Sequence, residues 1–369
     1  MTDNELLALP LDAWHREKGA RMVPFAGFAM PLQFAGILAE HEWTRTSASL
    51  FDVSHMGQIS VSGAGADALL EALLPTAISA LAPGRIRYSL LLNDAGGIID
   101  DLMLTRRDED FLLVVNGATR HSDLAYIQGF AAPDTAVKLA EDQALLALQG
   151  PLAAEVLDVL VPGVGALSFM TAAAFAWEGA RLWISRSGYC GEDGFEISLP
   201  AAMAPSFAGA LLADERCRPA GLGARDSLRL EAGLPLYGHD LDESIDPISA
   251  GLAFALSPKR MAAGGFQGHA ALASIGANEP ASLRVGLAIE GRQPAREGAP
   301  VLHNGAPVGR VTSGGFSPTL GYPIALAFVP PALAQEGTSL AVQVRGRDLP
   351  ARVTPLPFVP HRYVRKGTA

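Results

Sequence analysis

Apolar and polar residues in the first third of the chain change their spacing several times, which predicts a mixture of helices and strands. Apolar residues at helical spacing predict helices over residues 9–19, 66–75 and 119–131. Alternating or continuous apolar runs between turn residues predict strands over residues 57–63, 87–94, 99–106 and 111–117. A Gly-Gly turn and an acidic turn separate the last three strands, so we expect an antiparallel meander there.

The middle third repeats this mixed pattern. A strand is predicted over 144–150, and a helix over 151–160 that tolerates Pro151 in its first turn. Two apolar runs on either side of the turn GYCGEDG predict a hairpin, over residues 181–187 and 195–200. A helix is predicted over 220–233. These elements do not alternate strictly, so the sequence favours α+β units over a parallel α/β sheet.

The last third contains only short strand patterns and turns. Strands are predicted over residues 283–291, 299–314, 324–330, 340–346 and 351–359. The pair Asn304-Gly305 is typical of a tight hairpin turn. We therefore predict three units: an α+β subdomain at 1–140, a second α+β subdomain at 141–280 and a small all-β barrel or sandwich at 281–369.

Composition and charge narrow the function classes. The chain has 369 residues, too many for one ordinary core, and 49% of them are hydrophobic. Its net charge of −10 argues against a nucleic-acid-binding protein, which normally carries a basic face. Two uncharged stretches, 159–177 and 197–213, are interrupted by Pro or Gly, so we interpret them as core segments rather than membrane spans.

The two cysteines indicate a reducing compartment. Cys190 and Cys217 are too few for a disulfide framework and lack the CxxC spacing of a zinc site. The first ten residues, MTDNELLALP, contain acids where a secretory signal has Lys or Arg. We expect a cytoplasmic protein. The histidines are dispersed and form no HExxH motif, so no metal site is predicted.

Two adjacent acids stand in the apolar segment NDAGGIIDDLMLTR. Strand alternation sends Asp100 and Asp101 to opposite faces, with Asp101 on the side of Met103. One interpretation is structural: one acid caps the Gly-Gly turn and the other is a satisfied edge residue. The alternative is functional, because a carboxylate facing an internal cavity is costly and such a cost suggests a role.

Glu196 and Arg225 have two interpretations each. In the second hairpin, Glu196 points away from Phe195, either into solvent or towards a ligand with an amidine-like edge, such as a pterin or guanine ring. Arg225 and Arg229 share one helical face, which suits a salt-bridged surface helix. Alternatively, Arg225 points inwards and holds an anion.

Two further motifs are weaker. The segment SGAGADALL, with Gly63, Gly65 and Ala68, matches a loose dinucleotide fingerprint. No parallel strand with a terminal acid follows it, so we interpret the glycines as a tight strand-to-helix turn. His55, in FDVSHMG, has the most suggestive neighbours of any histidine, and we interpret it as a structural residue.

The segments FDVSHMG, NDAGGIIDDLMLTR, ALLALQGP, SGYCGEDGFEIS, ARDSLRLEAGLPLYGHD, RVTSGGFSP and PFVPHRY occur in this order. Together they resemble the aminomethyltransferase of the glycine cleavage system, the T-protein, over nearly the whole chain. The resemblance implies a three-domain cloverleaf with folate at its centre. It also implies transfer of the aminomethyl carbon from the lipoyl arm of the H-protein to tetrahydrofolate, which yields methylene-tetrahydrofolate and ammonia.

The resemblance also assigns site residues. Asp101 corresponds to the acid that faces the reacting folate nitrogens, and Asp100 receives no role. Because an ionised Asp is a weak base unless burial raises its pKa, we expect Asp101 to act mainly by charge and positioning. Glu196 corresponds to the pterin-binding glutamate. Two further ligand contacts are implied at Arg225 and Tyr363, and cavity-lining positions at Met56, Asn116, Phe169 and Tyr189.

Two rival functions remain at this stage. The first is a related folate-dependent demethylase, which would share the folate cavity and differ in its second substrate. The second is a non-catalytic folate-binding protein, but such relatives carry a KGCYxGQE-type segment where this chain has SGYCGEDGFEIS. Tetrahydrofolate is expected as a substrate and the lipoylated H-protein as the partner, with no metal, nucleic acid or membrane.

Overall fold

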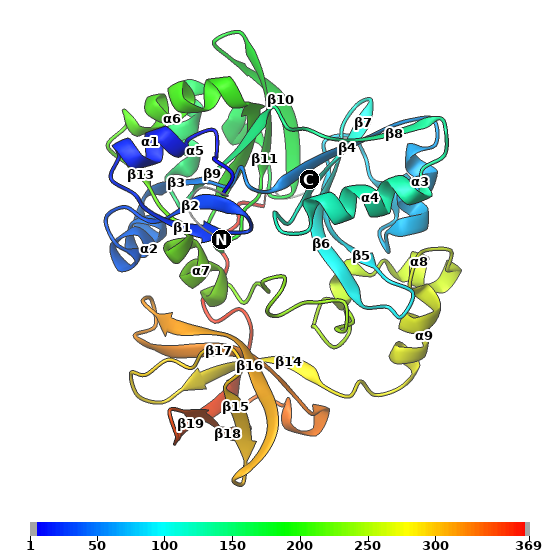
Figure 1. Cartoon of the computed structure of the whole chain (residues 1–369), viewed down its shortest axis with the longest axis vertical. Helices are drawn as coiled ribbons and strands as arrows, with labels where there is room; N and C mark the ends of the chain where they lie inside the picture. The colour runs from blue at the N-terminus through cyan, green and yellow to red at the C-terminus, as the bar shows by residue number, and fades with distance from the viewer. Residues whose placement is uncertain (1–5, 366–369) are drawn as a thin grey trace.

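The computed structural model describes residues 6–365 and contains two α+β units above a small barrel (Figure 1). The two α+β units stand side by side, each with a sheet that faces the other unit. The barrel lies below both of them. This arrangement confirms the predicted α+β class with a C-terminal barrel.

The first unit contains a five-stranded antiparallel sheet. Its strand order is β5 (Ile86–Leu92), β6 (Ile98–Arg106), β7 (Asp110–Val115), β4 (Gly57–Gly63) and β8 (Thr135–Leu139). Two helices, α3 (Ala66–Leu73) and α4 (Arg120–Phe130), cover one face. Leu70, Leu104 and Ile127 are buried in the core between helices and sheet. The predicted meander is confirmed by the β5–β6–β7 order.

The second unit contains a six-stranded sheet. Its order is β10 (Thr171–Trp177), β11 (Ala180–Arg186), β12 (Gly194–Pro200), β9 (Gln143–Gln149), β3 (Ala48–Asp52) and β13 (Cys217–Pro219). Helices α5 (Ala153–Leu160) and α6 (Ala204–Leu212) pack on it around Phe195 and Phe207. Over residues 6–365, no helix is both long and apolar enough to cross a membrane.

The start of the chain departs from the predicted division at residue 140. After α1 (Asp12–Glu17), β1 (Arg21–Phe25), β2 (Phe28–Gln33) and α2 (Ile37–Thr46), strand β3 pairs with β9 and β13 of the second sheet. All five residues of β3 are buried, so the strand shows no alternation. Its partner β9 lies about 100 residues further on, where local patterning cannot reveal it. Residues 6–52 therefore pack mainly with the second unit.

The C-terminal unit is a closed six-stranded barrel. Around it run β14 (Leu283–Ile289), β17 (Tyr322–Val329), β16 (Ala306–Ser317), β15 (Pro300–His303), β18 (Ser339–Val344) and β19 (Arg347–Thr354). Asn304 and Gly305 both have positive φ, which confirms the predicted tight turn between β15 and β16. Closure leaves the barrel without free strand edges.

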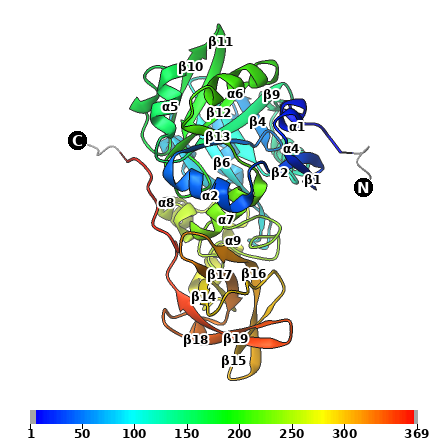
Figure 2. The ribbon, with the colours of Figure 1, turned by 90° about the vertical axis from the view of Figure 1, so that its left-hand side faces the viewer.

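Helix α7 (Leu222–Glu231) and two short helices, α8 (Pro258–Ala263) and α9 (His269–Ala277), lie between the sheets and the barrel (Figure 2). Short 3₁₀ turns complete the described structure, at Ile78–Ala80, Val164–Ala166, Ala201–Met203, Ala253–Ala255 and Pro331–Leu333.

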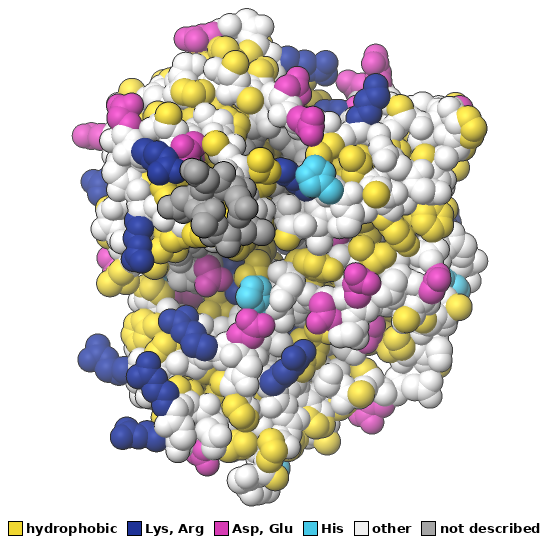
Figure 3. All heavy atoms as spheres, in the orientation of Figure 1, with side chains coloured by type: hydrophobic (Ala, Val, Ile, Leu, Met, Phe, Trp, Pro, Cys, Tyr) yellow, Lys and Arg dark blue, Asp and Glu magenta, His cyan; other side chains and the backbone are white. Residues whose placement is uncertain are grey.

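On the face shown in Figure 3, acidic side chains are scattered, while several Lys and Arg side chains gather along one side of the barrel.

A buried ion-pair network joins the second unit and the barrel near α7. The Arg45 guanidinium donates to Glu231 at 2.6 Å and to Glu192 at 2.8 Å. Glu231 also accepts hydrogen bonds from Ser317 and Thr319 of the barrel. Burial opposes ionisation of Glu231, but these bonds and His41 outweigh it and lower its pKa to about 2. The network thus connects α2, the β11–β12 loop, α7 and the barrel.

We expect Arg45→Met to lower the free energy of unfolding by about 3–5 kcal/mol, because two buried carboxylates lose their cation. Denaturant unfolding followed by circular dichroism measures the change. Arg216→Met is the control, since the Arg216 ion pairs are exposed and its loss should change stability little. Equal effects of the two substitutions would contradict the role of the network.

Candidate active site

The hairpin between β5 and β6 sets the position of the two adjacent acids. The Asn93 side-chain carbonyl accepts the Gly97 backbone N–H at 2.9 Å, and Gly96 has a φ of +80°. A Cβ on Gly97 would lie 1.8 Å from the Glu243 carbonyl oxygen, so only glycine fits. The turn is therefore capped by Asn93, which corrects the interpretation that one of the acids caps it.

Asp101 lies half-buried on the face of β6 that looks towards the second unit. The Tyr88 hydroxyl donates to its Oδ2 atom at 2.9 Å, and the Asn116 side-chain amide donates to its Oδ1 atom at 2.8 Å. Burial and the charge of Asp100 raise the pKa of Asp101 to about 7, although both hydrogen bonds act in the opposite direction. A carboxyl group with this pKa can both accept and return a proton at neutral pH.

Asp100 points to the opposite face of β6, as alternation predicts. It is fully buried and accepts hydrogen bonds from the backbone N–H of Asn116 at 3.0 Å and from its side-chain amide at 2.8 Å. The Asn116 amide therefore contacts both acids. Asn116, expected only as a cavity-lining residue, is the link between the two faces of the strand.

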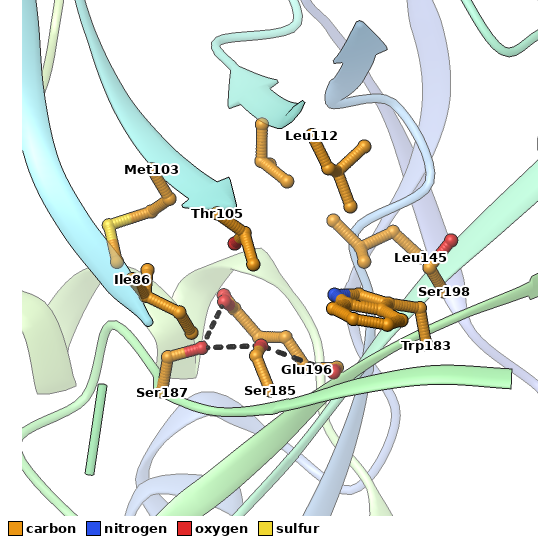
Figure 4. A pocket seen from close by; sticks show the side chains of 11 residues that line it. Ile86, Met103, Thr105, Leu112, Leu145, Trp183, Ser185, Ser187, Glu196 and Ser198 are labelled. Atoms are coloured by element: carbon orange, nitrogen blue, oxygen red, sulfur yellow. Dashed lines mark hydrogen bonds between the residues drawn. The ribbon is translucent and has the colours of Figure 1, made fainter. Parts of the chain in front are cut away.

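Glu196 faces the first unit across a narrow cavity between the two sheets (Figure 4). Its neighbours Phe195 and Ile197 point into the core of the second unit. The Ser187 hydroxyl donates to Glu196 Oε2 at 2.7 Å, and Ser185 lies 2.8 Å from Ser187. The cavity is lined by Ile86, Met103, Thr105, Leu112, Val114, Leu145, Trp183, Ser185, Ser187, Glu196 and Ser198. The alternative of a solvent-facing Glu196 is therefore wrong.

Arg225 and Arg229 have different environments although they share one helix. Arg229 is buried and pairs with Asp226 and Asp240, both at 2.9 Å, so the surface-helix interpretation fails for it. The Arg225 guanidinium lies over the Tyr189 ring, 4.9 Å from its centre. Within residues 6–365, no carboxylate forms an ion pair with the half-buried Arg225 side chain, which suits it to an anionic ligand.

The C-terminal strap, residues 355–365, runs from the barrel back to the second unit (Figure 2). Backbone hydrogen bonds hold it, from Val359 to the Glu231 carbonyl at 2.9 Å and from Arg362 to the Gly191 carbonyl at 2.8 Å. Tyr363 then stacks on Phe169 with ring centres 4.0 Å apart and an interplanar angle of 5°. The strap therefore places a stacked aromatic pair next to the β11–β12 loop.

Met56 and His55 follow β3 and lie beside the cavity. Met56 packs in a cluster with Val114 and Leu145, which both line the cavity. His55 is buried, and burial together with the Arg225 charge lowers its pKa to about 4, so the ring is neutral. This agrees with the structural interpretation of His55.

Close packing explains the glycines of the dinucleotide-like segment. A Cβ on Gly63 would lie 2.1 Å from the Asp134 carbonyl oxygen, at the turn between β4 and α3. No group of three His, Cys, Asp or Glu residues in the described structure is arranged to hold a metal ion. The observed site thus consists of carboxylates, one cation and aromatic rings.

Three polar residues of the site were missed by the sequence analysis: Tyr88, Ser187 and Asp123. The first two follow from register, because Tyr88 lies diagonally across from Asp101, and Ser187 is two residues beyond Ser185, the strand partner of Glu196. Asp123 lies on α4, and nothing in the local pattern marks it.

Comparison with known proteins agrees with this arrangement. Residues 11–260 match the GCVT N-terminal domain, and residues 283–360 match the glycine cleavage T-protein C-terminal barrel domain. An aminomethyltransferase from Rubrobacter xylanophilus is 45% identical, over 95% of this chain and 93% of its own length. A mitochondrial aminomethyltransferase from Gallus gallus is 45% identical, over 97% of this chain and 94% of its own length.

A solved structure shows the same fold. The crystal structure of glycine cleavage system aminomethyltransferase T from Bartonella henselae aligns with a TM-score of 0.94 and 43% sequence identity. The alignment covers 98% of this chain and 100% of the other. The chain therefore belongs to the glycine cleavage T-protein family.

Proposed function

We propose that the protein transfers the aminomethyl carbon from the lipoyl arm of the H-protein to tetrahydrofolate. The observation that carries the proposal is the Asp101 carboxylate, held by Tyr88 and Asn116 on one wall of the site. Glu196 lines the narrow cavity between the two sheets together with Met103, which follows Asp101 on the same face of β6. Family membership supports an enzyme of this class.

The reaction exchanges two bonds at one carbon. The bonds from this carbon to the lipoyl sulfur and to the amino nitrogen break, and two bonds to neighbouring folate nitrogens form. The two protons of those folate nitrogens pass to the sulfur and to the departing ammonia, so that atoms and charge balance. The carbon becomes cationic on the way, and a fixed carboxylate in a water-poor site favours such a cation.

Asp101 serves this reaction in two ways. Its charge stabilises the cationic carbon, and its pKa of about 7 lets it take a proton from a folate nitrogen and return it to a leaving group. We therefore assign Asp101 a larger part in proton transfer than the sequence led us to expect. Tyr88 and Asn116 hold the carboxylate in position for both roles.

The other residues suit binding of tetrahydrofolate. The two oxygens of Glu196 accept the paired N–H donors of the pterin edge, while the Ser187 hydroxyl, which donates to Oε2, holds the carboxylate in position. Arg225 holds a carboxylate of the glutamate tail. Phe169 and Tyr363 offer an aromatic surface to the folate rings. Met56 and Tyr189 complete the wall.

The implied partner is the lipoylated H-protein, which must deliver its arm to Asp101. The protein is expected to act in the cytoplasm, since Cys190 and Cys217 are free, buried thiols that suit a reducing compartment.

An assay with purified protein, tetrahydrofolate and aminomethylated H-protein tests the proposal. Equal amounts of ammonia and methylene-tetrahydrofolate, formed only when all three components are present, are expected. Folate binding without either product would contradict the proposal and favour the demethylase. Absence of folate binding would remove Glu196, Arg225 and Tyr363 from the site.

We expect Tyr363→Ala to raise the dissociation constant for tetrahydrofolate about tenfold, because the ligand loses one stacking ring of about 1–1.5 kcal/mol. Fluorescence titration measures the constant. Tyr322→Ala, at an exposed tyrosine on the barrel, is the control and should leave binding unchanged. Wild-type affinity in Tyr363→Ala would exclude the ring from the site.

A further inference from the structure

Two buried carboxyl groups lie behind Asp101, on the side away from the cavity. Asp100 of β6 and Asp123 of α4 are each 0% exposed. Asp100 accepts two hydrogen bonds from Asn116, whereas within the described structure no well-formed hydrogen bond reaches either Asp123 oxygen, and only Asp100 and Thr119 act on Asp123 as hydrogen-bonding neighbours. A buried carboxylate without a hydrogen-bond donor costs free energy, so this pair of acids needs one proton between its oxygens.

A proton between the two acids supplies the missing hydrogen bond. Two carboxyl groups in contact in an apolar site do not both ionise. Burial and the charge of Asp123 raise the pKa of Asp100 far above its ordinary value, whereas burial raises that of Asp123 only to about 6. At neutral pH, Asp100 therefore keeps its proton and donates it to the Asp123 carboxylate.

Asn116 connects this pair to the active site. Its Nδ2 atom lies 2.8 Å from Asp100 Oδ1 and 2.8 Å from Asp101 Oδ1. The Asp101 backbone carbonyl also lies 3.2 Å from Nδ2, but the amide has only two hydrogen atoms, and we assign them to the two shorter contacts, one to each acid. The orientation of the Asn116 side chain, and with it the position of Asp101 Oδ1, therefore depends on Asp100.

We propose that Asp100 and Asp123 share one proton and that this pair, acting through Asn116, positions the Asp101 carboxylate. The inference rests on the proposed function of Asp101. Asp100 and Asp123 do not touch the substrate and are positioning residues. Burial is the main cause of the raised pKa of Asp101, and the charge of Asp100 adds to it whenever Asp100 is ionised. The shared proton limits this second contribution while Asp100 still accepts hydrogen bonds from Asn116.

The other titratable groups around these acids are neutral phenols or more distant charges. Burial and the charge of Asp101 raise the pKa of Tyr88, burial raises that of Tyr189, and burial and Asp100 raise that of Tyr237, so all three rings stay protonated. The charge of Arg284 of β14 acts to lower the pKa of Tyr88, and the charges of Arg229 and Arg225 act to lower that of Tyr189, but burial outweighs them. The charge of the Asp100–Asp123 pair is thus the charge nearest to Asp101 that a substitution can change.

Two isosteric substitutions have opposite expected effects. In Asp100→Asn, residue 100 stays neutral and its amide donates to Asp123, but its single carbonyl oxygen keeps only one of the two hydrogen bonds from Asn116. In Asp123→Asn, the new amide donates to Asp100, which then ionises and carries its charge next to Asp101. The first variant keeps residue 100 neutral. The second leaves a charged Asp100 next to Asp101.

Single-turnover rates of methylene-tetrahydrofolate formation between pH 5.5 and 9 distinguish the variants. For Asp100→Asn, we expect a pH midpoint close to that of the wild type and a rate lowered by the same factor at every pH, because one hydrogen bond that positions Asn116 is lost. For Asp123→Asn, we expect the midpoint to rise by about one unit, which makes the rate about fivefold lower at pH 7 and restores it near pH 9. Asp108→Asn, in an exposed turn, is the control. A loss of rate in Asp123→Asn that is the same at every pH, or a shifted pH midpoint in Asp100→Asn alone, would overturn the proposal.

Infrared spectroscopy tests the proton without turnover. At pH 7.5 the wild type should show a protonated carboxyl band that loses most of its intensity in Asp100→Asn, where only the protonated fraction of Asp101 contributes. An unchanged spectrum would overturn the proposal. This measurement also decides the matter if Asp123→Asn does not fold. A wild type that forms no methylene-tetrahydrofolate would refute the proposed function, whereas an active wild type without these shifts would refute only the proton-sharing pair.

Discussion

Asp101→Asn is expected to lower the rate of methylene-tetrahydrofolate formation by about 10²–10⁴-fold while folate still binds. The amide keeps the size of the carboxylate and can hydrogen-bond to Tyr88. It carries no charge to stabilise a cationic carbon, and it cannot accept a proton from a folate nitrogen. Single-turnover measurement with aminomethylated H-protein gives the rate, and fluorescence titration gives the folate dissociation constant.

Stability separates this effect from damage to the fold. Because the folded state raises the pKa of Asp101 to about 7, it retains a proton that the unfolded chain has already released above pH 4. The contribution of Asp101 to the free energy of unfolding therefore falls as the pH rises from about 4 to 7. At pH 8, Asp101→Asn should melt no lower than the wild type. Full activity in this variant would remove Asp101 from the mechanism.

Glu196→Gln is expected to raise the dissociation constant for tetrahydrofolate about 10–100-fold, which corresponds to about 1.5–3 kcal/mol for hydrogen bonds to a charged group. The carboxylate can accept two N–H donors from one ring edge, whereas the amide presents one oxygen and one competing donor. Isothermal titration calorimetry measures the constant.

Ser198→Ala is the matched control for Glu196→Gln. Ser198 lies two residues further along β12 and lines the same cavity. Its hydroxyl is not assigned a ligand contact, so its loss should change affinity little. Unchanged affinity in Glu196→Gln, or equal losses in both variants, would contradict the assignment of the pterin edge to Glu196.

Local sequence patterns were sufficient where the partner strand is close in the chain. The β5–β6 and β11–β12 hairpins could be predicted because a turn, alternation and a few residues define them. The opposite orientations of Asp100 and Asp101 followed from the strand period alone. An all-β C-terminal unit was also predictable, since its strands are short and separated by turn residues, although this pattern fitted a sandwich as well as the observed closed barrel.

Long-range contacts could not be predicted in this way. Strand β3 joins the second sheet through a parallel pair with β13 and an antiparallel pair with β9, both far away in the chain. No element was predicted around Arg45, and Glu231 lay at the end of a predicted helix, yet the two are buried together as an ion pair. Such pairs depend on how helices pack, and periodicity does not report this.

The same limit applies to the site. Residue types and strand faces suggested that Asp101 and Glu196 face a cavity, but only the family resemblance gave them roles. The raised pKa of Asp101 depends on Asp100, Tyr88 and Asn116 together, and thus on three segments of the first sheet. Its chemistry is a property of the assembled fold.

A crystal structure of the protein with tetrahydrofolate is the most direct test of this account. We expect the pterin edge on the Glu196 carboxylate, a tail carboxylate at Arg225, and the reacting nitrogens within about 3–3.5 Å of Asp101 or of a water bound to it. Folate bound outside the space between the two sheets, or bound there with its reacting nitrogens turned away from Asp101, would contradict it.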